Sequence, residues 1–528
     1  MPIAKILVAN RSEIAIRVFR AANELGLKTV AIWAEEDKYS LHRFKADESY
    51  QVGRGPWLVK DMGPIESYLS IDEVIRVAKL SGADAIHPGY GLLSESPEFA
   101  EACAEAGITF IGPKPETMRR LGNKDAARNL AIEVGVPEGP ATDPLPDDTA
   151  EIKRLAAGIG YPVMLKASWG GGGRGMRAIR SEADLLREVT EGKREAKAAF
   201  GKDEVYLEKL VERARHVEVQ ILGDTHGNAV HLFERDCSIQ RRNQKVVERA
   251  PAPYLSNELR QELCGYALKI ANETSYIGAG TVEFLQDADT GKFYFIEVNP
   301  RIQVEHTVTE QVTGIDIVKA QIHILDGFAI GTPESGVPAQ KDIRLNGHAL
   351  QCRITTEDPE QNFIPDYGRI TAYRGATGFG IRLDGGTAYS GAVITRFYDP
   401  LLEKVTAWAP TPVEAISRMN RALREFRIRG VATNLTFLEA IINHPSFADN
   451  SYTTKFIDTT PELFAQVKRQ DRATKLLNYL ADVSVNGHPE TRGRPKPNPD
   501  AAAPVIPWYT APVPGGTKQK LDTLGPEG

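Results

Sequence analysis

The stretch Phe295–His306 reads FIEVNPRIQVEH and alternates apolar with polar residues. Successive side chains of an extended chain point to opposite faces, so this alternation predicts a strand with one apolar and one polar face. Pro300 can bend the chain within the stretch. The predicted polar face carries five side chains that bind ions or move protons: Glu297, Asn299, Arg301, Gln303 and Glu305.

A second strand is expected at Thr281–Leu285, with a turn at Asp287–Gly291 before the first stretch. A hairpin of these two strands would bring Glu283 near Glu297, although the pattern leaves its register open. Two carboxylates and an amide suit a hard cation such as Mg²⁺, which usually also holds substrate phosphates. The alternative is a solvated polar strand face, but the apolar residues 293–296 favour burial, and buried charges need partners.

A run of four glycines, Gly170–Gly173, follows the predicted strand Tyr161–Ala167. Glycine weakens regular structure, but it lets backbone N–H groups approach a phosphate closely. Lys166, at the end of the strand, can reach phosphate oxygens, and the segment lacks the Gly-Lys-Ser/Thr of a Walker A loop. The pattern favours a phosphate-binding loop over a flexible surface loop.

The N-terminal region begins with a strand at 5–10, an amphipathic helix at 12–25 and a strand at Lys28–Ala34. This order predicts a right-handed βαβ unit within an open α/β domain. No G-x-G-x-x-G follows the first strand, which argues against a dinucleotide site.

The whole chain is expected to combine α/β and α+β domains. Short strands are expected over 345–410, helices at 412–425, 434–443 and 461–481, and a Pro-rich tether from Gly487 to Gly516. The expected parts are an α/β domain at 1–122, a domain at 123–330 that holds the glycine run and has a lid at about 140–210, a mixed β/α domain at 331–455, and a helical and Pro-rich tail at 456–528.

Composition excludes several classes of protein. A chain of 528 residues needs several cores, and a net charge of −6 gives no general attraction to nucleic acid or membranes. No apolar run is long enough for a membrane helix, and no signal peptide precedes the first strand. The four cysteines are scattered, which favours a reducing, cytoplasmic setting.

Five separated strings resemble the biotin carboxylases, which belong to the ATP-grasp enzymes. They are Asn10–Ala15, His87–Gly91, Glu234–Ser238, Gln244–Glu248 and Arg301–His306, and the similarity spans roughly 1–455. The resemblance implies that the chain carboxylates biotin with ATP and bicarbonate through carboxyphosphate. It also implies Mg²⁺ (or Mn²⁺) as cofactor and biotin as a substrate, either free or on another domain.

The resemblance also implies residue roles. Glu305 matches the base for bicarbonate, Arg353 matches the arginine that stabilises the biotin enolate, and Lys245 and Arg301 complete the catalytic set. The implied metal ligands are Glu283, Glu297 and Asn299. Bicarbonate and biotin contacts are implied for Gln303, Val304, Tyr90 and Asp399. The implied ATP contacts are Lys124, Lys166, Gly171, Gly172, Gly173, Met176, Glu208, Lys209, Val211, His216 and Gln240.

Some of these residues have plainer interpretations. His216 could be a core histidine, and Lys245 ends a charged run that by itself suggests a solvated face. Arg353, between Cys352 and Ile354, suggests a half-buried arginine that needs an acceptor. The family commonly has Gly where Ser12 stands and often His at Asn243. Ser12 is harmless if its φ is negative, and Asn243 is given no catalytic role.

Two segments favour the biotin carboxylase region of a single-chain pyruvate carboxylase. Basic residues in Glu425–Val431, and a tail from Phe456 that resembles the passage into a carboxyltransferase domain, carry this resemblance. Expected partners are therefore a biotin carrier domain, a carboxyltransferase domain and a second copy within a larger homo-oligomer, and acetyl-CoA is an expected effector at Arg427, Arg429 and Arg472. No Ala-Met-Lys-Met motif is present, so the carrier is expected elsewhere. The alternatives are an acyl-CoA carboxylase component, another ATP-grasp ligase and a non-catalytic binding module.

Overall fold

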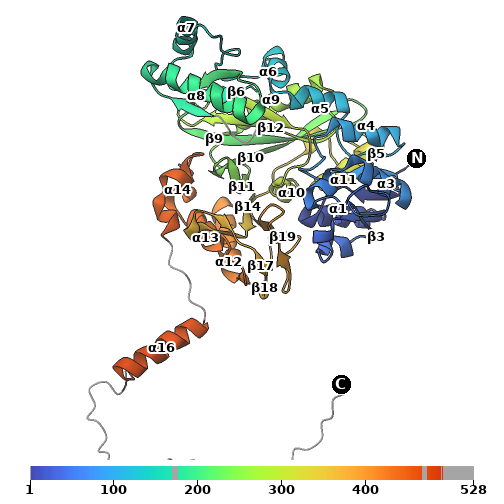
Figure 1. The fold of residues 1–528 in the computed structure, drawn as a ribbon, viewed down its shortest axis with the longest axis vertical. Coiled ribbons are helices and arrows are strands. Elements are labelled where there is room, and N and C mark those ends of the chain that lie inside the picture. Colours follow the sequence, from blue (N-terminus) through green and yellow to red (C-terminus); the bar gives the residue numbers. More distant parts are fainter. Residues whose placement is uncertain (1, 169–175, 466–471, 489, 491–528) are drawn as a thin grey trace, which may run out of the picture. The chain divides into compact units, whose positions relative to one another are not determined.

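The N-terminal region forms a sheet of five parallel strands in the order β3-β2-β1-β4-β5 (Figure 1). The strands are β1 (Lys5–Val8), β2 (Lys28–Trp33), β3 (Glu48–Gln51), β4 (Ala85–His87) and β5 (Thr109–Phe110). Helices here are α1 (Ser12–Glu24), α2 (Pro64–Leu69), α3 (Ile71–Ser81), α4 (Pro97–Glu105) and α5 (Pro115–Gly122). The predicted strand, helix and strand at the start of the chain are confirmed. Strand order reverses between β1 and β4, and ligands of open α/β sheets bind at the carboxyl ends of strands at such a point.

The computed structural model describes residues 2–168, 176–465, 472–488 and 490. Residues 1–466 make up one unit and 467–528 a second. In the second unit the described helix is α16 (Arg472–Asn486). Among the described residues, every helix is too short or too polar to cross a lipid bilayer.

An eight-stranded antiparallel sheet forms the centre of the first unit, in the order β13-β12-β9-β10-β11-β14-β21-β19. Its strands are β9 (Ala214–Gly223), β10 (Ala229–Arg241), β11 (Gln244–Ala250), β12 (Gly278–Asp287), β13 (Phe293–Asn299), β14 (His348–Thr355), β19 (Ile381–Gly385) and β21 (Leu401–Ala409). The sheet therefore joins strands from the two expected regions 123–330 and 331–455 into one surface.

A tight hairpin between β10 and β11 fixes the part of this sheet that carries Lys245. Arg242 and Asn243 both have positive φ, 49° and 65°. A two-residue loop with this geometry matches the twist of antiparallel strands, and Asn adopts it more readily than most residues. Asn243 thus has a structural role as a turn residue.

A smaller sheet, β7-β6-β8, forms its own layer with α7 and α8 (Figure 1). It consists of β6 (Val163–Ala167), β7 (Arg177–Ile179) and β8 (Val205–Lys209), with α7 (Thr149–Ile159) and α8 (Glu182–Phe200). Leu165, Val205 and Leu207 are fully buried in its core. The glycine run between β6 and β7 lies outside the described residues.

Helices complete the first unit. The central helices are α6 (Lys124–Glu133), α9 (Asn257–Glu273), α10 (His306–Thr313) and α11 (Ile317–Leu325). The later ones are α12 (Pro412–Glu425), α13 (Leu435–Ile442), α14 (Pro445–Ala448) and α15 (Phe456–Thr459). Short strands form three two-stranded pairs: β15 (Glu357–Asp358) with β16 (Ile364–Pro365), β17 (Gly368–Arg369) with β20 (Val393–Ile394), and β18 (Ala372–Arg374) with β22 (Arg427–Arg429). The predicted helices at 412–425 and 434–443 are confirmed.

One local prediction is wrong. β13 ends at Asn299, so the strand expected through Glu305 stops at Pro300, whose ring cannot continue a sheet ladder. Ser12 has a φ of 58°, so the condition under which serine would be harmless there, a negative φ, is not met. Glycine adopts this region freely, which gives a physical reason for the Gly that the family commonly has at this position.

Arg235 makes four side-chain hydrogen bonds within the large sheet and to the helix beside it. It is fully buried on β10, and its guanidinium donates to Glu218 Oε1 at 2.6 Å and to Gln220 Oε1 at 2.7 Å. Further bonds of 3.0 Å reach the hydroxyls of Thr281 and Thr309. The guanidinium thus ties β9, β10, β12 and α10 together.

We expect Arg235→Met to lower the free energy of unfolding by about 3–5 kcal/mol, because removing one partner of a buried pair leaves the other charge uncompensated. Urea unfolding followed by tryptophan fluorescence measures this loss. The matched control is Arg180→Met, since Arg180 pairs with Glu212 at the surface and is 60% exposed; its effect should stay within about 0.5 kcal/mol. Equal effects of the two substitutions would contradict the assignment.

Candidate active site

A cavity of about 810 Å³ opens where the carboxyl ends of β1 and β4 face the large sheet. Asn10 joins the two loops that follow these strands, because its amide donates to the carbonyls of Pro88 at 2.7 Å and Tyr90 at 2.8 Å. Twelve residues expected in the site line this cavity: Tyr90, His216, Lys245, Glu283, Glu297, Asn299, Arg301, Gln303, Val304, Glu305, Arg353 and Asp399. The predicted residues are thus brought together from segments more than 300 positions apart in the sequence.

Lys245 lies at the centre of the charged groups, with a side chain that is 12% exposed. Its ammonium contacts three carboxylates, Glu218 at 2.5 Å, Glu305 at 2.7 Å and Glu283 at 2.9 Å. It also donates to the amide oxygen of Gln303 at 3.2 Å. The interpretation of Lys245 as a solvated surface lysine is therefore wrong.

Glu305 is held between two cations. Besides Lys245, it accepts from Arg353 Nη2 at 3.1 Å, while Arg353 Nε donates to Glu248 at 2.5 Å. Burial alone would raise the pKa of the Glu305 carboxyl, but Lys245 and Arg353 outweigh burial and hold that pKa well below its usual range. Glu305 is thus an ionised carboxylate, and Arg353 has the acceptors that a half-buried arginine needs.

The predicted hairpin is confirmed, and its register places Glu283 directly opposite Glu297. The amide of Asn299 donates to Glu283 Oε1 at 2.9 Å. Burial and the neighbouring Glu283 both raise the pKa of Glu297, whereas burial of Glu283 is outweighed by Lys245 and His216, which lower its pKa. Two adjacent carboxylates and an amide oxygen fit a hard divalent cation, because the repulsion between the carboxylates is relieved when a cation binds.

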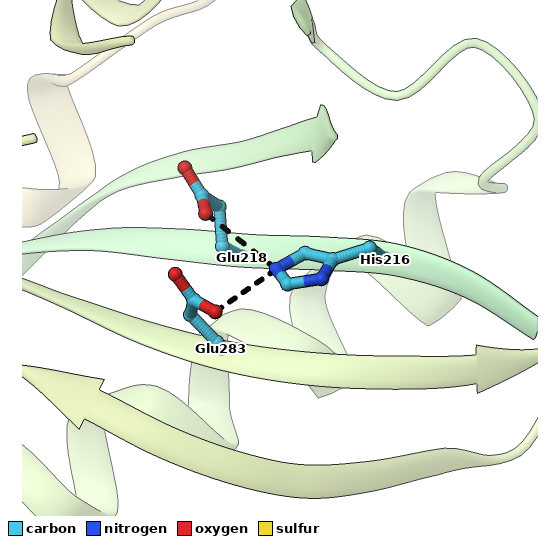
Figure 2. A group of neighbouring side chains, drawn as sticks. All are labelled: His216, Glu218 and Glu283. Atoms are coloured by element: carbon cyan, nitrogen blue, oxygen red, sulfur yellow. Dashed lines mark ion pairs between the residues drawn. The ribbon is translucent and has the colours of Figure 1, made fainter. Parts of the chain in front are cut away.

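His216 lies beside the carboxylates of Glu218 and Glu283 (Figure 2). Its Nε2 is 3.1 Å from Glu283 Oε2 on the adjacent strand and 3.8 Å from Glu218 Oε2 on its own strand. These three side chains also have the spacing of a possible metal-binding group. His216 is buried, but it faces the cavity, so the position agrees with a ligand contact better than with a core histidine.

Apart from His216, the described residues expected to bind the nucleotide do not line this cavity. Lys166 on β6 pairs with Glu208 on β8 at 2.6 Å. The ammonium of Lys209 donates to the carbonyls of Gly160 and Tyr161, and the amide of Gln240 donates to Cys237 O at 2.9 Å.

The remaining nucleotide positions are placed by their elements alone. Lys124 begins α6, Val211 follows β8, and Met176 precedes β7 and is 40% exposed. Gly171, Gly172 and Gly173 lie outside the described residues. The contacts expected of all these residues with ATP stay predictions.

Arg301, Tyr90 and Asp399 also line the cavity. Arg301 pairs with Glu95 and donates to Asn299 Oδ1 at 3.0 Å, which holds it beside the hairpin. The hydroxyl of Tyr90 donates to Glu13 Oε1. Asp399 is an exposed residue at the cavity rim, and its carboxylate accepts from Leu401 N at 2.9 Å.

Comparison with known families covers most of the chain. Three family models match: "Biotin carboxylase, N-terminal domain" at residues 2–118, "Carbamoyl-phosphate synthase L chain, ATP binding domain" at 123–332, and "Biotin carboxylase C-terminal domain" at 351–459. The biotin carboxylase domain of Hydrogenobacter thermophilus 2-oxoglutarate carboxylase, solved with MgADP and bicarbonate, is 44% identical, with a TM-score of 0.81 over 89% of this chain and 100% of that one. The chain belongs to the biotin carboxylase family.

Longer relatives share this biotin carboxylase sequence. Pyruvate carboxylase of Rhizobium etli, in a variant solved with acetyl coenzyme A, is 83% identical with a TM-score of 0.84, over 97% of this chain and 45% of that one. Pyruvate carboxylase of Bacillus subtilis is 51% identical over 526 residues. The chain spans 45% of the Bacillus protein, so it corresponds to less than half of such relatives.

Sequence reasoning missed two carboxylates that hold the cations of this biotin carboxylase site. Glu218 binds Lys245 and Arg235, and Glu248 binds Arg353. His216, Glu218 and Gln220 alternate with valines on β9 and share one face, so the alternation used for Glu297 would have found them. Glu248 was within a family string, but it carried no assigned role.

We expect the stability loss of Lys245→Met to depend on pH. Lys245 depresses the pKa of Glu283 and Glu305, so these carboxylates stabilise the native fold above their ordinary pKa and lose that effect as pH falls through the depressed value. Without the ammonium, burial raises both pKa values. The variant should then be least stable near neutrality and recover as the pH falls.

The measurement is the melting temperature of the wild type and of Lys245→Met at about pH 8 and about pH 5.5. The gap between the two proteins should narrow at the lower pH. Lys28→Met is the matched control, because Lys28 is 68% exposed and only 3.4 Å from Asp47 at the surface. A gap that is constant across this range would contradict the assignment.

Proposed function

We propose that this biotin carboxylase carries out the first half-reaction of a pyruvate carboxylase, in which ATP and bicarbonate carboxylate biotin through carboxyphosphate. One observation carries the proposal: a single cavity holds a carboxylate between two cations, Glu305 with Lys245 and Arg353, next to the carboxylate pair Glu283 and Glu297. That arrangement provides a base, cations for an oxyanion and ligands for a divalent cation on adjacent surfaces.

In the first step, bicarbonate would lie beside Glu305, with Lys245 and Arg301 as its cations and Gln303 and Val304 along its sides. The Glu305 carboxylate removes the bicarbonate proton as the bicarbonate oxygen attacks the γ-phosphorus of ATP, and the bond to ADP breaks. Carboxyphosphate and ADP are the products. Lys245 and Arg301 would stabilise the negative charge that develops.

Divalent metal would be held by Glu283, Glu297 and Asn299. When bound there, Mg²⁺ or Mn²⁺ neutralises the phosphate oxygens of ATP. The nucleotide itself would extend toward His216, Gln240 and the layer of β6, β7 and β8, which supplies Lys166, Glu208 and Lys209.

The second step concerns biotin. Carboxyphosphate releases CO₂ and phosphate, the phosphate removes the N1′ proton of biotin, and N1′ attacks CO₂ to give carboxybiotin. Arg353 offers a planar fork of donors to the enolate oxygen that forms. Tyr90 and Asp399 line the same cavity, and they would contact the biotin ring.

Pyruvate is the favoured final acceptor because the long relatives are pyruvate carboxylases over the full length of this chain. The carrier and carboxyltransferase domains of the whole protein would then receive the carboxybiotin, and a second copy would complete a homo-oligomer. An acyl-CoA carboxylase component is the second candidate.

All four cysteines are buried free thiols, which agrees with a reducing cytoplasmic compartment.

The test is bicarbonate-dependent ATP hydrolysis by this chain, with and without free biotin. We expect biotin to stimulate phosphate release, and we expect Glu305→Gln to reduce the stimulated rate about 10²–10⁴-fold, the usual contribution of a general base. Lys28→Met serves as control. If neither biotin nor the Glu305 substitution changed the rate of ATP hydrolysis, the proposed function would be refuted, and the chain would be an ATP-grasp ligase with a different acceptor.

An effector site is proposed at Arg427 and Arg429. Arg427 and Arg429 are exposed on β22, on either side of the buried Ile428, and β22 pairs with β18. Two exposed guanidinium groups on one face suit the phosphates of acetyl-CoA. Arg472 begins α16 in the second unit.

We expect Arg427→Glu with Arg429→Glu to raise the acetyl-CoA concentration needed for half-activation of the full-length enzyme by at least about tenfold, because a charge reversal repels the phosphates. Activity without acetyl-CoA should persist. Arg180→Glu, at a remote surface position, is the control. An unchanged activation curve would refute the site.

A further inference from the structure

Lys404 is a buried lysine behind the cavity wall. It lies on β21, its side chain is fully buried, and its ammonium is 3.0 Å from Glu13 Oε2. The same ammonium donates to the carbonyl of Val304 at 2.9 Å, and it lies 5.9 Å from the centre of the Tyr90 ring. An ammonium removed from water costs several kcal/mol unless it is paired, so these contacts are strong constraints on where their partners can lie.

All three of these partners line the cavity, and they come from separate parts of the chain. Glu13 belongs to α1, Tyr90 to the loop after β4, and Val304 to the segment between β13 and α10. Glu13 extends the chain of contacts, because its other oxygen accepts the hydroxyl of Tyr90. The Lys404 ammonium thus links Tyr90, through Glu13, to the peptide group between Val304 and Glu305.

Few other groups near Lys404 could replace its contact with Glu13. Glu13 is 4% exposed, and burial raises its pKa while the Lys404 ammonium opposes that rise. Asp384, opposite Lys404 on β19, is already paired with Arg382 at 2.7 Å. Removing Lys404 would take away the cation that opposes protonation of Glu13, and a protonated Glu13 would compete with Tyr90 as a hydrogen-bond donor.

We propose that Lys404 is a positioning residue that holds the biotin end of the cavity, at Tyr90, in register with the bicarbonate end, at Val304 and Glu305. The inference rests on the proposed function for the roles of these two ends. Lys404 lies behind the cavity wall and touches neither reactant, and it acts through Glu13 and the Val304 carbonyl. Since CO₂ forms at one end and is captured by biotin at the other, an error in their separation reduces transfer directly.

The variant that tests this is Lys404→Met, which keeps the length of the side chain and removes its charge. We expect kcat/KM for free biotin to fall about 100-fold, the effect of a displacement of roughly 1 Å. The KM for biotin should rise, whereas the KM for ATP should stay within about twofold, because the contacts of Lys404 are with Glu13, Val304 and Tyr90. A loss of folded protein would lower kcat and leave both KM values unchanged, and that result would contradict a positioning role. Lys28→Met is the control.

A double-mutant cycle with Glu13→Gln sharpens the test. If the two side chains act as one linked pair, their combined effect on kcat/KM for biotin should be clearly smaller than the product of the single effects. Multiplicative effects would contradict a shared role. Should Lys404→Met fail to fold, Tyr90→Phe removes the hydroxyl bond to Glu13 alone, and an unchanged KM for biotin would then overturn the proposal.

Crystal structures of the same variants separate this proposal from the proposed function. Loss of biotin-stimulated ATP hydrolysis in the wild type would refute the function and would leave the positions of side chains unaffected. In Lys404→Met we expect the Tyr90 ring and the Val304 carbonyl to move relative to each other. Unmoved positions of both groups would refute the positioning role, whatever the wild-type activity.

Discussion

Three buried carboxylates, Glu218, Glu283 and Glu305, meet at the ammonium of Lys245, and the rest of the site depends on this contact. Buried charges of one sign repel strongly in a medium that screens poorly, so the group exists only because a cation lies between its members. The fold supplies that cation from β11 and the carboxylates from β9, β12 and the segment after β13. Two further cations help to neutralise these carboxylates: Arg235 pairs with Glu218, and Arg353 pairs with Glu305. The register of the long antiparallel sheet places most of these side chains next to one another.

The same contacts bear on how Glu305 could act as a base. With both cations in contact, its pKa lies well below the usual range, so the free site holds a weak base. A bound bicarbonate anion would compete for Lys245 and Arg353, and each contact that it takes from Glu305 would raise the proton affinity of the carboxylate. Basicity would therefore appear when the substrate is in place. That coupling limits proton uptake by Glu305 in the empty site.

Sequence reasoning predicted the part of the site that regular structure controls. Glu297 and Asn299 share a strand face, and the turn before that strand indicated the hairpin that brings Glu283 opposite Glu297. Arg301, Gln303 and Glu305 reach the cavity for a different reason than alternation, since the strand has ended and α10 begins at His306. The resemblance to a family located them, because spacing alone could not say how the chain turns after Pro300.

Other residues could not be predicted, because their function depends on pairing between distant segments. Nothing around Lys404 in the sequence distinguishes it from a surface lysine, and Glu13 lies 391 positions away from it on a helix. Their contact arises only because β21 joins the large sheet next to β14, while α1 follows the first strand of the other sheet. One apolar cluster packs α1 and β1 with strands of the large sheet, and charged contacts such as that of Lys404 with Glu13 join the cavity wall. Charged contacts are directional, so they fix the separation of groups across the cavity more sharply than nondirectional burial can.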